Sequence, residues 1–133
     1  MSTKKTPPSI NEWLKDAKAD PAAPQVGMFL VHNGVVRQTP KAKVRHGLDD
    51  GSLVKSLDFS YDAAKVDEAI AETHKMKGIF YVKVWLNEGK LEVGDDIMYV
   101  LIGGDIRPHV VDALQFLVET IKTGCVTEIE YKE

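Results

Sequence analysis

The sequence predicts an α+β fold, in which two main helices cover one face of a mostly antiparallel sheet and a short helix precedes them. Apolar runs of strand length alternate with two longer segments whose apolar residues recur at helical spacing. The expected order is a short helix and two strands, then a main helix, further strands, a second main helix and a last strand, which is typical of an α+β sandwich. The run 96–103 is almost wholly apolar and therefore predicts a central strand covered on both faces.

The beginning of the chain is expected to hold a tail and then a short helix. Residues 1–8 are polar and proline-bearing, so we expect a disordered tail, and residues 9–133 are expected to form a single domain. Ser9 and Glu12 have the spacing of a capping box, which predicts a helix that ends before Pro21.

The remaining elements follow from periodicity and from turn residues. Segment 26–37 is apolar and β-branched, and predicts one or two strands with a bend near Asn33 and Gly34. Segment 38–52 lacks periodicity, is basic in its first half and acidic in its second, and is typical of a mobile loop. The later expected elements begin with a strand at 53–61 and a helix at 62–77 that is stopped by Gly78. Strands at 79–86, 90–93 and 96–103 follow. The final helix is expected to be capped by Asp105, with Pro108 in its first turn and Gly124 at its end, and a last strand runs from Cys125 to Lys132.

Composition excludes several classes of protein. The formal net charge of −3 argues against a nucleic-acid-binding domain held by bulk electrostatics. The single cysteine, Cys125, excludes an internal disulfide and a cysteine-based zinc site. The N-terminus lacks the apolar core of a signal peptide, and no run reaches the roughly 18 apolar residues of a membrane span. We therefore expect a cytoplasmic protein.

The strong catalytic motifs are missing from the sequence. There is no phosphate-binding glycine loop, no HExxH and no paired-cysteine motif. The four histidines are scattered over different predicted elements, so we expect no metal site. Cys125 has no histidine nearby in the sequence, which favours a small buried residue over a nucleophile.

Four cations at the ends of predicted elements remain as candidates: Arg37, Arg107, Lys122 and Lys132. Each has an ordinary explanation, since a lysine in a last helical turn complements the macrodipole and a terminal lysine is usually exposed. Arg107 fits such an explanation less well, because a cation in the first turn of a helix opposes the dipole. An arginine there could share an anion with free backbone N–H groups, so an anion-binding cluster is the functional alternative.

A family resemblance covers residues 26–133. The runs "NGVVR", "KLEVGDDIMYVLIGGDIR" and "DALQFLVETIK", with the closing "YKE", resemble the large, catalytic subunit of molybdopterin synthase in their order and spacing. The resemblance implies an α/β-hammerhead-like fold and a homodimer. It also implies a partner, a small ubiquitin-like sulfur carrier that ends in Gly-Gly, bound by each protomer.

The implied reaction transfers sulfur from the thiocarboxylated end of the carrier to cyclic pyranopterin monophosphate, forming the dithiolene of molybdopterin without a metal or organic cofactor. By position, the resemblance implies that Lys122 and Lys132 are catalytic and that Arg37 and Arg107 bind the substrate. Arginines suit a phosphate through fork-like hydrogen bonds. A lysine ammonium can hold the anionic sulfur, and a lysine with a lowered pKa could move protons.

The sequence departs from the family at several places, and two of them concern the candidate site. Ile106 stands where the family has histidine before the arginine, and the closing segment is longer and has Tyr131 in place of tryptophan. These departures leave a second hypothesis, a diverged non-catalytic homologue that binds a carrier tail or a small anion without turnover. An unrelated α+β binding domain is a third.

Overall fold

The computed structural model describes residues 3–47 and 51–132 and has the predicted α+β architecture. The strands of these residues are β1 (Met28–Val35), β2 (Val54–Tyr61), β3 (Ile79–Leu86), β4 (Gly89–Glu92), β5 (Asp96–Gly104) and β6 (Val126–Lys132). The helices are α1 (Ile10–Lys18), α2 (Lys41–His46), α3 (Ala63–His74) and α4 (Arg107–Gly124), with a 3₁₀ turn η1 at Ala23–Gln25. No helix within the described residues is long and apolar enough to cross a membrane.

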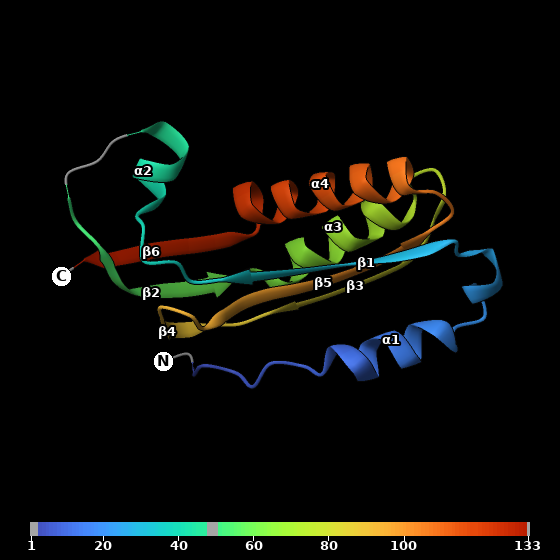
Figure 1. Ribbon diagram of the computed structural model, residues 1–133, viewed down its shortest axis with the longest axis horizontal. Helices are drawn as coiled ribbons and strands as arrows, with labels where there is room; N and C mark the ends of the chain where they lie inside the picture. Colours follow the sequence, from blue (N-terminus) through green and yellow to red (C-terminus); the bar gives the residue numbers. More distant parts are fainter. Residues whose placement is uncertain (1–2, 48–50, 133) are drawn as a thin grey trace.

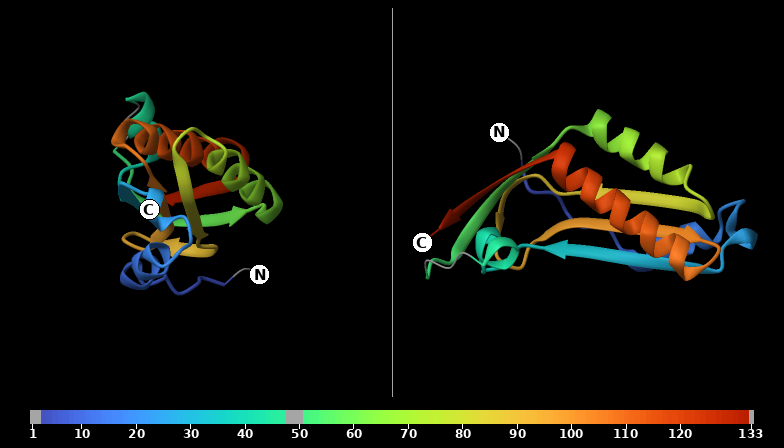
Figure 2. Two further views of the ribbon diagram at one scale, coloured as in Figure 1. Left: turned by 90° about the vertical axis from the view of Figure 1, so that its right-hand side faces the viewer. Right: turned by 90° about the horizontal axis from the view of Figure 1, so that it is seen from above.

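The strands form two antiparallel three-stranded sheets instead of one. The first sheet has the order β1-β5-β3 and the second has the order β4-β2-β6. Helices α3 and α4 lie together on one face of the first sheet, while α1 lies on its other face (Figure 1). Figure 2 shows the second sheet extending from one end of this layered body. The prediction of two main helices on one face is therefore confirmed.

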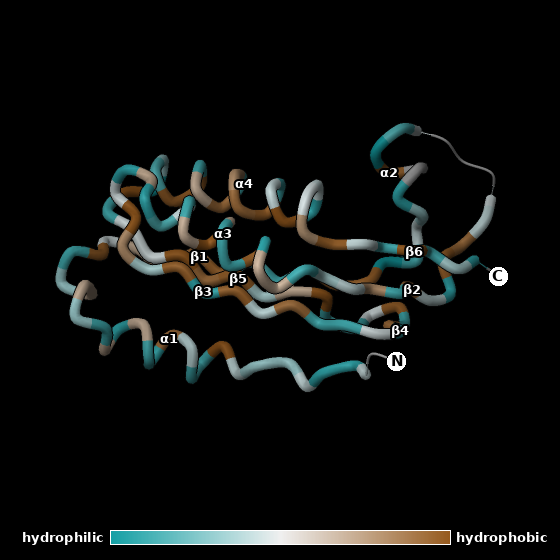
Figure 3. Tube along the Cα trace, turned by 180° about the vertical axis from the view of Figure 1, so that it is seen from behind, coloured by the Kyte–Doolittle hydropathy of each residue, from teal (hydrophilic) through white to brown (hydrophobic). Residues whose placement is uncertain are grey.

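Strand β5 has the central, doubly covered position that its apolar run predicted. Val100 and Ile102 belong to the main core cluster with α3 and α4, whereas Leu101 packs with Trp13 and Ala17 of α1. All three β5 residues have no exposed surface. Because successive side chains of a strand point to opposite faces, β5 holds the two layers of helices together. Hydrophobic residues accordingly concentrate along β1, β3 and β5 (Figure 3).

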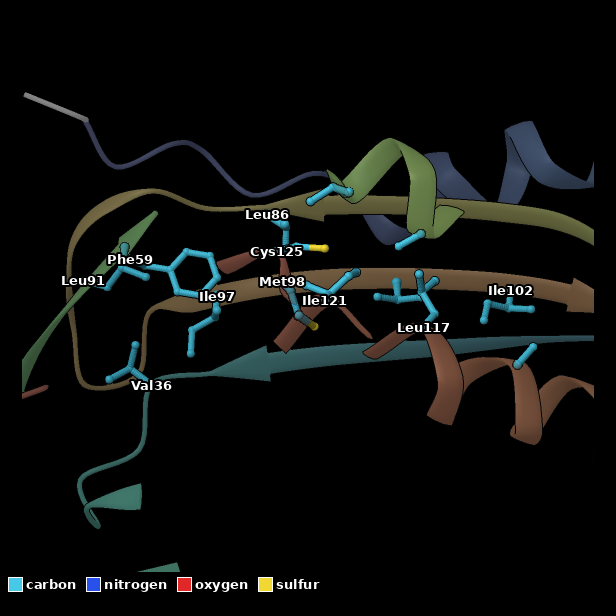
Figure 4. Packing of buried hydrophobic residues seen from close by; sticks show 14 of the residues in the cluster. Val36, Phe59, Leu86, Leu91, Ile97, Met98, Ile102, Leu117, Ile121 and Cys125 are labelled. Carbon is cyan, nitrogen blue, oxygen red and sulfur yellow. The ribbon is translucent and has the colours of Figure 1, made fainter. Parts of the chain in front are cut away.

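The main core continues to the junction of the two sheets. Phe59 of β2 and Leu91 of β4 lie in the same cluster as Met98 of β5 and Ile121 of α4 (Figure 4). Cys125 is 6% exposed and belongs to this cluster as well, so the buried, non-nucleophilic interpretation of its thiol fits the structure. Burial raises the pKa of that thiol, which disfavours the reactive thiolate.

The cap of α1 forms as its sequence predicted, and α3 has a cap of the same kind. The Ser9 hydroxyl accepts a hydrogen bond from the backbone N–H of Glu12 at 3.3 Å, and α1 ends before Pro21. Asp62 caps α3 in the same way, by accepting from the backbone N–H of Lys65 at 3.2 Å. Helix α3 ends at His74, three residues before its predicted end, and Gly78 lies in the turn that follows, with a φ of +79° that glycine adopts without strain.

Helix α4 begins one residue later than predicted. Its N-cap residue is Ile106, which has no side-chain cap, so the prediction that Asp105 caps the helix was wrong. The Asp105 carboxylate instead accepts from the backbone N–H of Ile106 and contacts His109 Nδ1 at 2.7 Å. This contact lowers the pKa of Asp105 and ties the first turn of the helix to the end of β5. Pro108 in the first turn and Gly124 at the last position lie where the sequence predicted them.

Two further regions differ in detail from the sequence-based expectation. Segment 38–52, predicted as a loop without structure, contains the six-residue helix α2, while residues 48–50 lie outside the described residues. The turn after β3 does not return the chain to the first sheet, because β4 pairs with β2 in the second sheet. Segment 26–37 forms a single strand, β1, and its register shifts between Gly34 and Val35, close to the predicted bend.

The described part of the N-terminal tail, residues 3–8, lies against the domain. The backbone N–H of Lys5 donates to Asn87 Oδ1 at 2.7 Å, and its ammonium donates to the Tyr61 hydroxyl at 2.8 Å. Lys4 pairs with Asp95 at 3.0 Å. The tail therefore bridges the turn after β3, the end of β2 and the turn before β5.

Candidate active site

A pocket of about 270 Å³ opens at the junction of the two sheets, where β1 ends, β5 begins and α4 gives way to β6. Its floor is apolar and includes Val36, Leu57 and Met98, which also belong to the core. Its polar lining comes from four elements and their flanking residues: His32, Arg37, Lys41, Arg45, Lys122, Glu128 and Glu130. The pocket thus brings together two of the four predicted site residues, Arg37 and Lys122.

Arg37 is positioned by the turn between β4 and β5. The preceding residue, Val36, donates its N–H to the Asp95 carbonyl at 2.9 Å, and its own carbonyl accepts from the N–H of Gly94 at 2.8 Å. Gly94 has a φ of +92°, which explains the glycine in this tight turn. Val36 is buried, so the backbone is held on one side while the exposed Arg37 side chain lies at the pocket. Its Nε donates to the carbonyl of Thr39 at 3.1 Å.

Lys122 is positioned by the buried stripe of α4. Val110, Ala113, Leu117 and Ile121 have no exposed surface and fix the rotation of the helix, so Lys122, next to Ile121, is only partly exposed. It lies in the last turn, where a cation complements the helix dipole. This location places an ammonium group at the pocket.

The pKa of Lys122 is lowered by its surroundings. Burial makes the largest contribution, because the charged form loses hydration. The positive charges of Arg45, Arg37 and Lys41 lower the pKa further, while the carboxylate of Glu128 raises it. A lysine in such a site can both hold an anion and give up a proton more readily than an exposed lysine.

His32 also lines the pocket, although no sequence pattern distinguished it from the other three histidines. It is half-buried on β1 and shares a face with Leu30 and Gly34. Burial and the positive charge of Lys122 lower its pKa, so the neutral imidazole is favoured. Its position on the inward face of a strand was the available signal, but it needed the register of β1 to be interpreted.

The other two predicted residues do not line this pocket. Arg107 is the first residue of α4 and Lys122 is in its last turn, so the helix separates them by about 22 Å at about 1.5 Å per residue. Lys132 is paired opposite Val54, a pocket residue, at the end of β6. Alternation along the strand places Lys132 on the same face as Glu128 and Glu130, about 13 Å beyond Glu128.

Sequence reasoning missed two pairs of charged residues. Lys41 and Arg45 come from α2, in the segment whose basic first half was recognised but was predicted to be a loop. Glu128 and Glu130 alternate along β6, and this period of two was the signal that both would face the same side. The pocket is therefore a mixed site, with four cations and two carboxylates around an apolar floor.

This arrangement suits the binding of anions more than metal chemistry. Arginine and lysine side chains hold phosphates and carboxylates, and a partly buried lysine adds a proton donor. No group of three or more histidine, cysteine, aspartate or glutamate residues with the geometry of a metal site occurs in residues 3–47 and 51–132.

The chain matches the model of the family described as MoaE protein over residues 3–124. The chain belongs to the MoaE family. This confirms the resemblance to the large subunit of molybdopterin synthase and gives the chain a role in molybdenum cofactor biosynthesis. None of the curated proteins matches it in sequence.

Solved structures support the fold of this MoaE family member. Molybdopterin synthase from Staphylococcus aureus matches with a TM-score of 0.67 and 19% identity, over 82% of this chain and 77% of the other. The molybdopterin biosynthesis MoaE protein from Burkholderia ambifaria matches with a TM-score of 0.70 and 16% identity, over 96% and 85%. The complex of subunits 1 and 2 of molybdopterin-converting factor from Helicobacter pylori matches with a TM-score of 0.63 and 17% identity, over 92% and 78%.

Proposed function

We propose that this protein is the catalytic subunit that transfers sulfur from a small carrier to cyclic pyranopterin monophosphate in the cytoplasm. The carrier is a ubiquitin-like protein that ends in Gly-Gly and carries the sulfur as a thiocarboxylate. The product is the dithiolene of molybdopterin. The observation that carries the proposal is the convergence of Arg37 and Lys122 on one pocket in a chain of the MoaE family.

The pocket supplies the interactions that this transfer requires. The Arg37 guanidinium offers several N–H donors to the phosphate of the pterin substrate. The Lys122 ammonium can hold the anionic sulfur of the carrier near the carbon that it attacks. Because its pKa is lowered, Lys122 can also pass a proton to the oxygen that leaves as sulfur arrives. The apolar floor limits water around these charges, which strengthens their interaction with the substrate.

The small subunit is proposed to bind at this pocket. The Helicobacter pylori structure is a complex of subunits 1 and 2 of molybdopterin-converting factor, and this chain covers 78% of the matched chain. A pocket that opens at the junction of the two sheets can admit an extended peptide, and its positive residues suit the terminal anion of such a tail.

A reconstitution assay tests the function directly. Purified protein, thiocarboxylated carrier and cyclic pyranopterin monophosphate are expected to yield molybdopterin, detected as its fluorescent oxidation product. The carrier with an ordinary carboxylate end is the control and should give none. If the protein binds the thiocarboxylated carrier but makes no molybdopterin, the chain is a diverged binding homologue and the proposed reaction is wrong.

The homodimer gives Arg107 a place in the proposed site. Within one protomer, α4 keeps Arg107 about 22 Å from Lys122 at about 1.5 Å per residue, so an Arg107 that binds substrate must come from the second protomer. Lys132 is proposed to act from the end of β6 in the same protomer as Lys122, because the strand directs it to the pocket face.

Mixed dimers of two inactive variants test this arrangement. A dimer with one Lys122→Ala protomer and one Arg107→Ala protomer should recover up to about half of native turnover, because one pocket then has both residues intact. A Lys122→Ala and Arg37→Ala dimer is the matched control and should stay inactive, since both residues belong to the same pocket of one protomer. If the first mixture shows no more turnover than the control, Arg107 does not complete the site of its partner.

A further inference from the structure

Helix α2 brings two cations to the pocket that neither the sequence motifs nor the family resemblance assigns. Lys41, its first residue, and Arg45, one turn later, both line the pocket. Arg45 also lines an adjoining groove beside α4, together with His32 and Lys122. Its side chain therefore lies where the two depressions meet, beside the partly buried ammonium group.

The start of α2 is clamped to β6 by two glutamates. The ammonium of Lys41 pairs with Glu128 Oε2 at 3.0 Å, and the backbone N–H of Lys41 donates to Glu130 Oε2 at 3.0 Å. The Glu128 side chain is only 12% exposed, so this ion pair is shielded from solvent more than an ordinary surface pair. A six-residue helix is too short to be stable by itself, and its position depends on such contacts.

The buried proline before α2 reinforces the clamp. Pro40 has a fixed φ, and its carbonyl accepts from the N–H of Val44 at 3.3 Å. Since Lys41 is held by its backbone and by its side chain, the orientation of α2 relative to β6 is set at the first residue of the helix. Arg45 follows one turn later and is thereby directed to the pocket.

The charges of the lining leave the pocket positive. Four cations face two carboxylates, and Lys41 is already neutralised by its pair with Glu128. Arg45 comes first among the cations that lower the pKa of Lys122, ahead of Arg37 and Lys41. Positive charges that repel one another in this way are relieved when an anion binds between them.

We propose that Arg45 is a further anion-binding residue of this pocket, and that Glu128 and Glu130 are positioning residues that hold α2 so that Arg45 meets the anion. The chemical class of ligand is a phosphate or phosphate ester. Arg45 thereby gives each pocket a second guanidinium from its own chain, in a protein that has Ile106 at the position of the family's histidine. That the ester is the cyclic phosphate of a pterin rests on the proposed function, whereas the binding of phosphate by Arg45 does not.

Titration with inorganic phosphate tests the role of Arg45 without any turnover. Arg45→Gln should bind phosphate at least about tenfold more weakly than the native protein, as expected for loss of a charge-assisted hydrogen bond. Lys75→Gln is the matched control, because it removes the same charge from an exposed position at the end of α3 and should leave binding unchanged. Phosphate binding that is absent in the native protein, or equal in the native and Arg45→Gln proteins, overturns the proposal.

The role of Glu128 is tested by whether its replacement weakens or strengthens phosphate binding. If Glu128 only repelled anions, Glu128→Gln would bind phosphate more tightly, whereas loss of the clamp should weaken binding several-fold. In an Arg45→Gln background the same substitution should have little effect, because a positioning residue acts through Arg45. Tighter phosphate binding by Glu128→Gln, or an equal loss in both backgrounds, contradicts the positioning role.

A second readout separates this role from general damage to the fold. Exchanging the charges, with Lys41→Glu and Glu128→Lys together, should restore part of the phosphate affinity lost in either single variant. NMR titration should show the pKa of Lys122 rising in Arg45→Gln, because a positive neighbour is removed. It should fall in Glu128→Gln, because a negative neighbour is removed. A Lys122 pKa that is the same in Arg45→Gln and in the native protein shows that Arg45 is not beside it. If these binding results hold but no molybdopterin is made, the proposed function fails and the anion site stands.

Discussion

Replacing Lys122 by alanine is expected to lower the rate of molybdopterin formation at least about a hundredfold, which is the usual contribution of a positioned proton-transfer group. The lysine lies half-buried at the pocket, and its ammonium is proposed to hold the sulfur anion and to move a proton. Single-turnover rates with thiocarboxylated carrier measure the loss. Gel filtration should show the same assembly as for the native protein, because the substitution leaves the buried stripe of α4 intact.

Two further variants sharpen this prediction. Lys122→Arg keeps the positive charge but not a readily lost proton, so it should retain carrier binding and still lose most of the turnover. Lys75→Ala removes an exposed lysine just after α3 that pairs with Glu72, and it should have native activity. Full activity in Lys122→Ala would show that the helix-end lysine has no part in the reaction.

Leu117→Ala should lower the free energy of unfolding by about 2–5 kcal/mol, the range for truncating a fully buried leucine. Leu117 has no exposed surface and packs α4 onto the sheet, five residues before Lys122. Urea unfolding at a fixed protein concentration measures the change, since the stability of the proposed dimer depends on concentration. A partial loss of activity at low urea should accompany it, because the same packing positions Lys122.

Leu53→Ala is the matched control for this stability effect. It deletes the same atoms at a position that is 40% exposed, just before β2. Surface substitutions of this kind usually change stability by less than about 0.5 kcal/mol. Equal losses for Leu53→Ala and Leu117→Ala would contradict the view that α4 is held mainly by its buried stripe.

The fold was predictable from the sequence because its elements carry strong local patterns. The apolar run of β5, the stripe of α4 and the capping residue Ser9 all predicted what the structure shows. The division into two sheets was not predictable. It depends on β4 pairing with β2 across the chain, and non-local pairing leaves no periodic signal in either segment.

The candidate site was predictable only in part. Arg37 and Lys122 were selected from element ends and from the resemblance, and the structure brings them to one pocket. The contributions of Arg45 and Glu128 depend on a short helix that is stabilised by tertiary contacts, which local propensity does not report. Arg107, in contrast, was selected from the sequence, but within one protomer it does not reach the pocket.

The most direct test of the central claim is a crystal structure of the protein with its carrier bound. We predict that the terminal glycine of the carrier lies in the pocket at the end of β1 and α4, with its terminal anion within about 3 Å of Lys122 Nζ, the distance of a charge-assisted hydrogen bond. A carrier tail that ends elsewhere on the surface, with Arg37 and Lys122 left facing solvent, would contradict the assignment of this pocket as the active site.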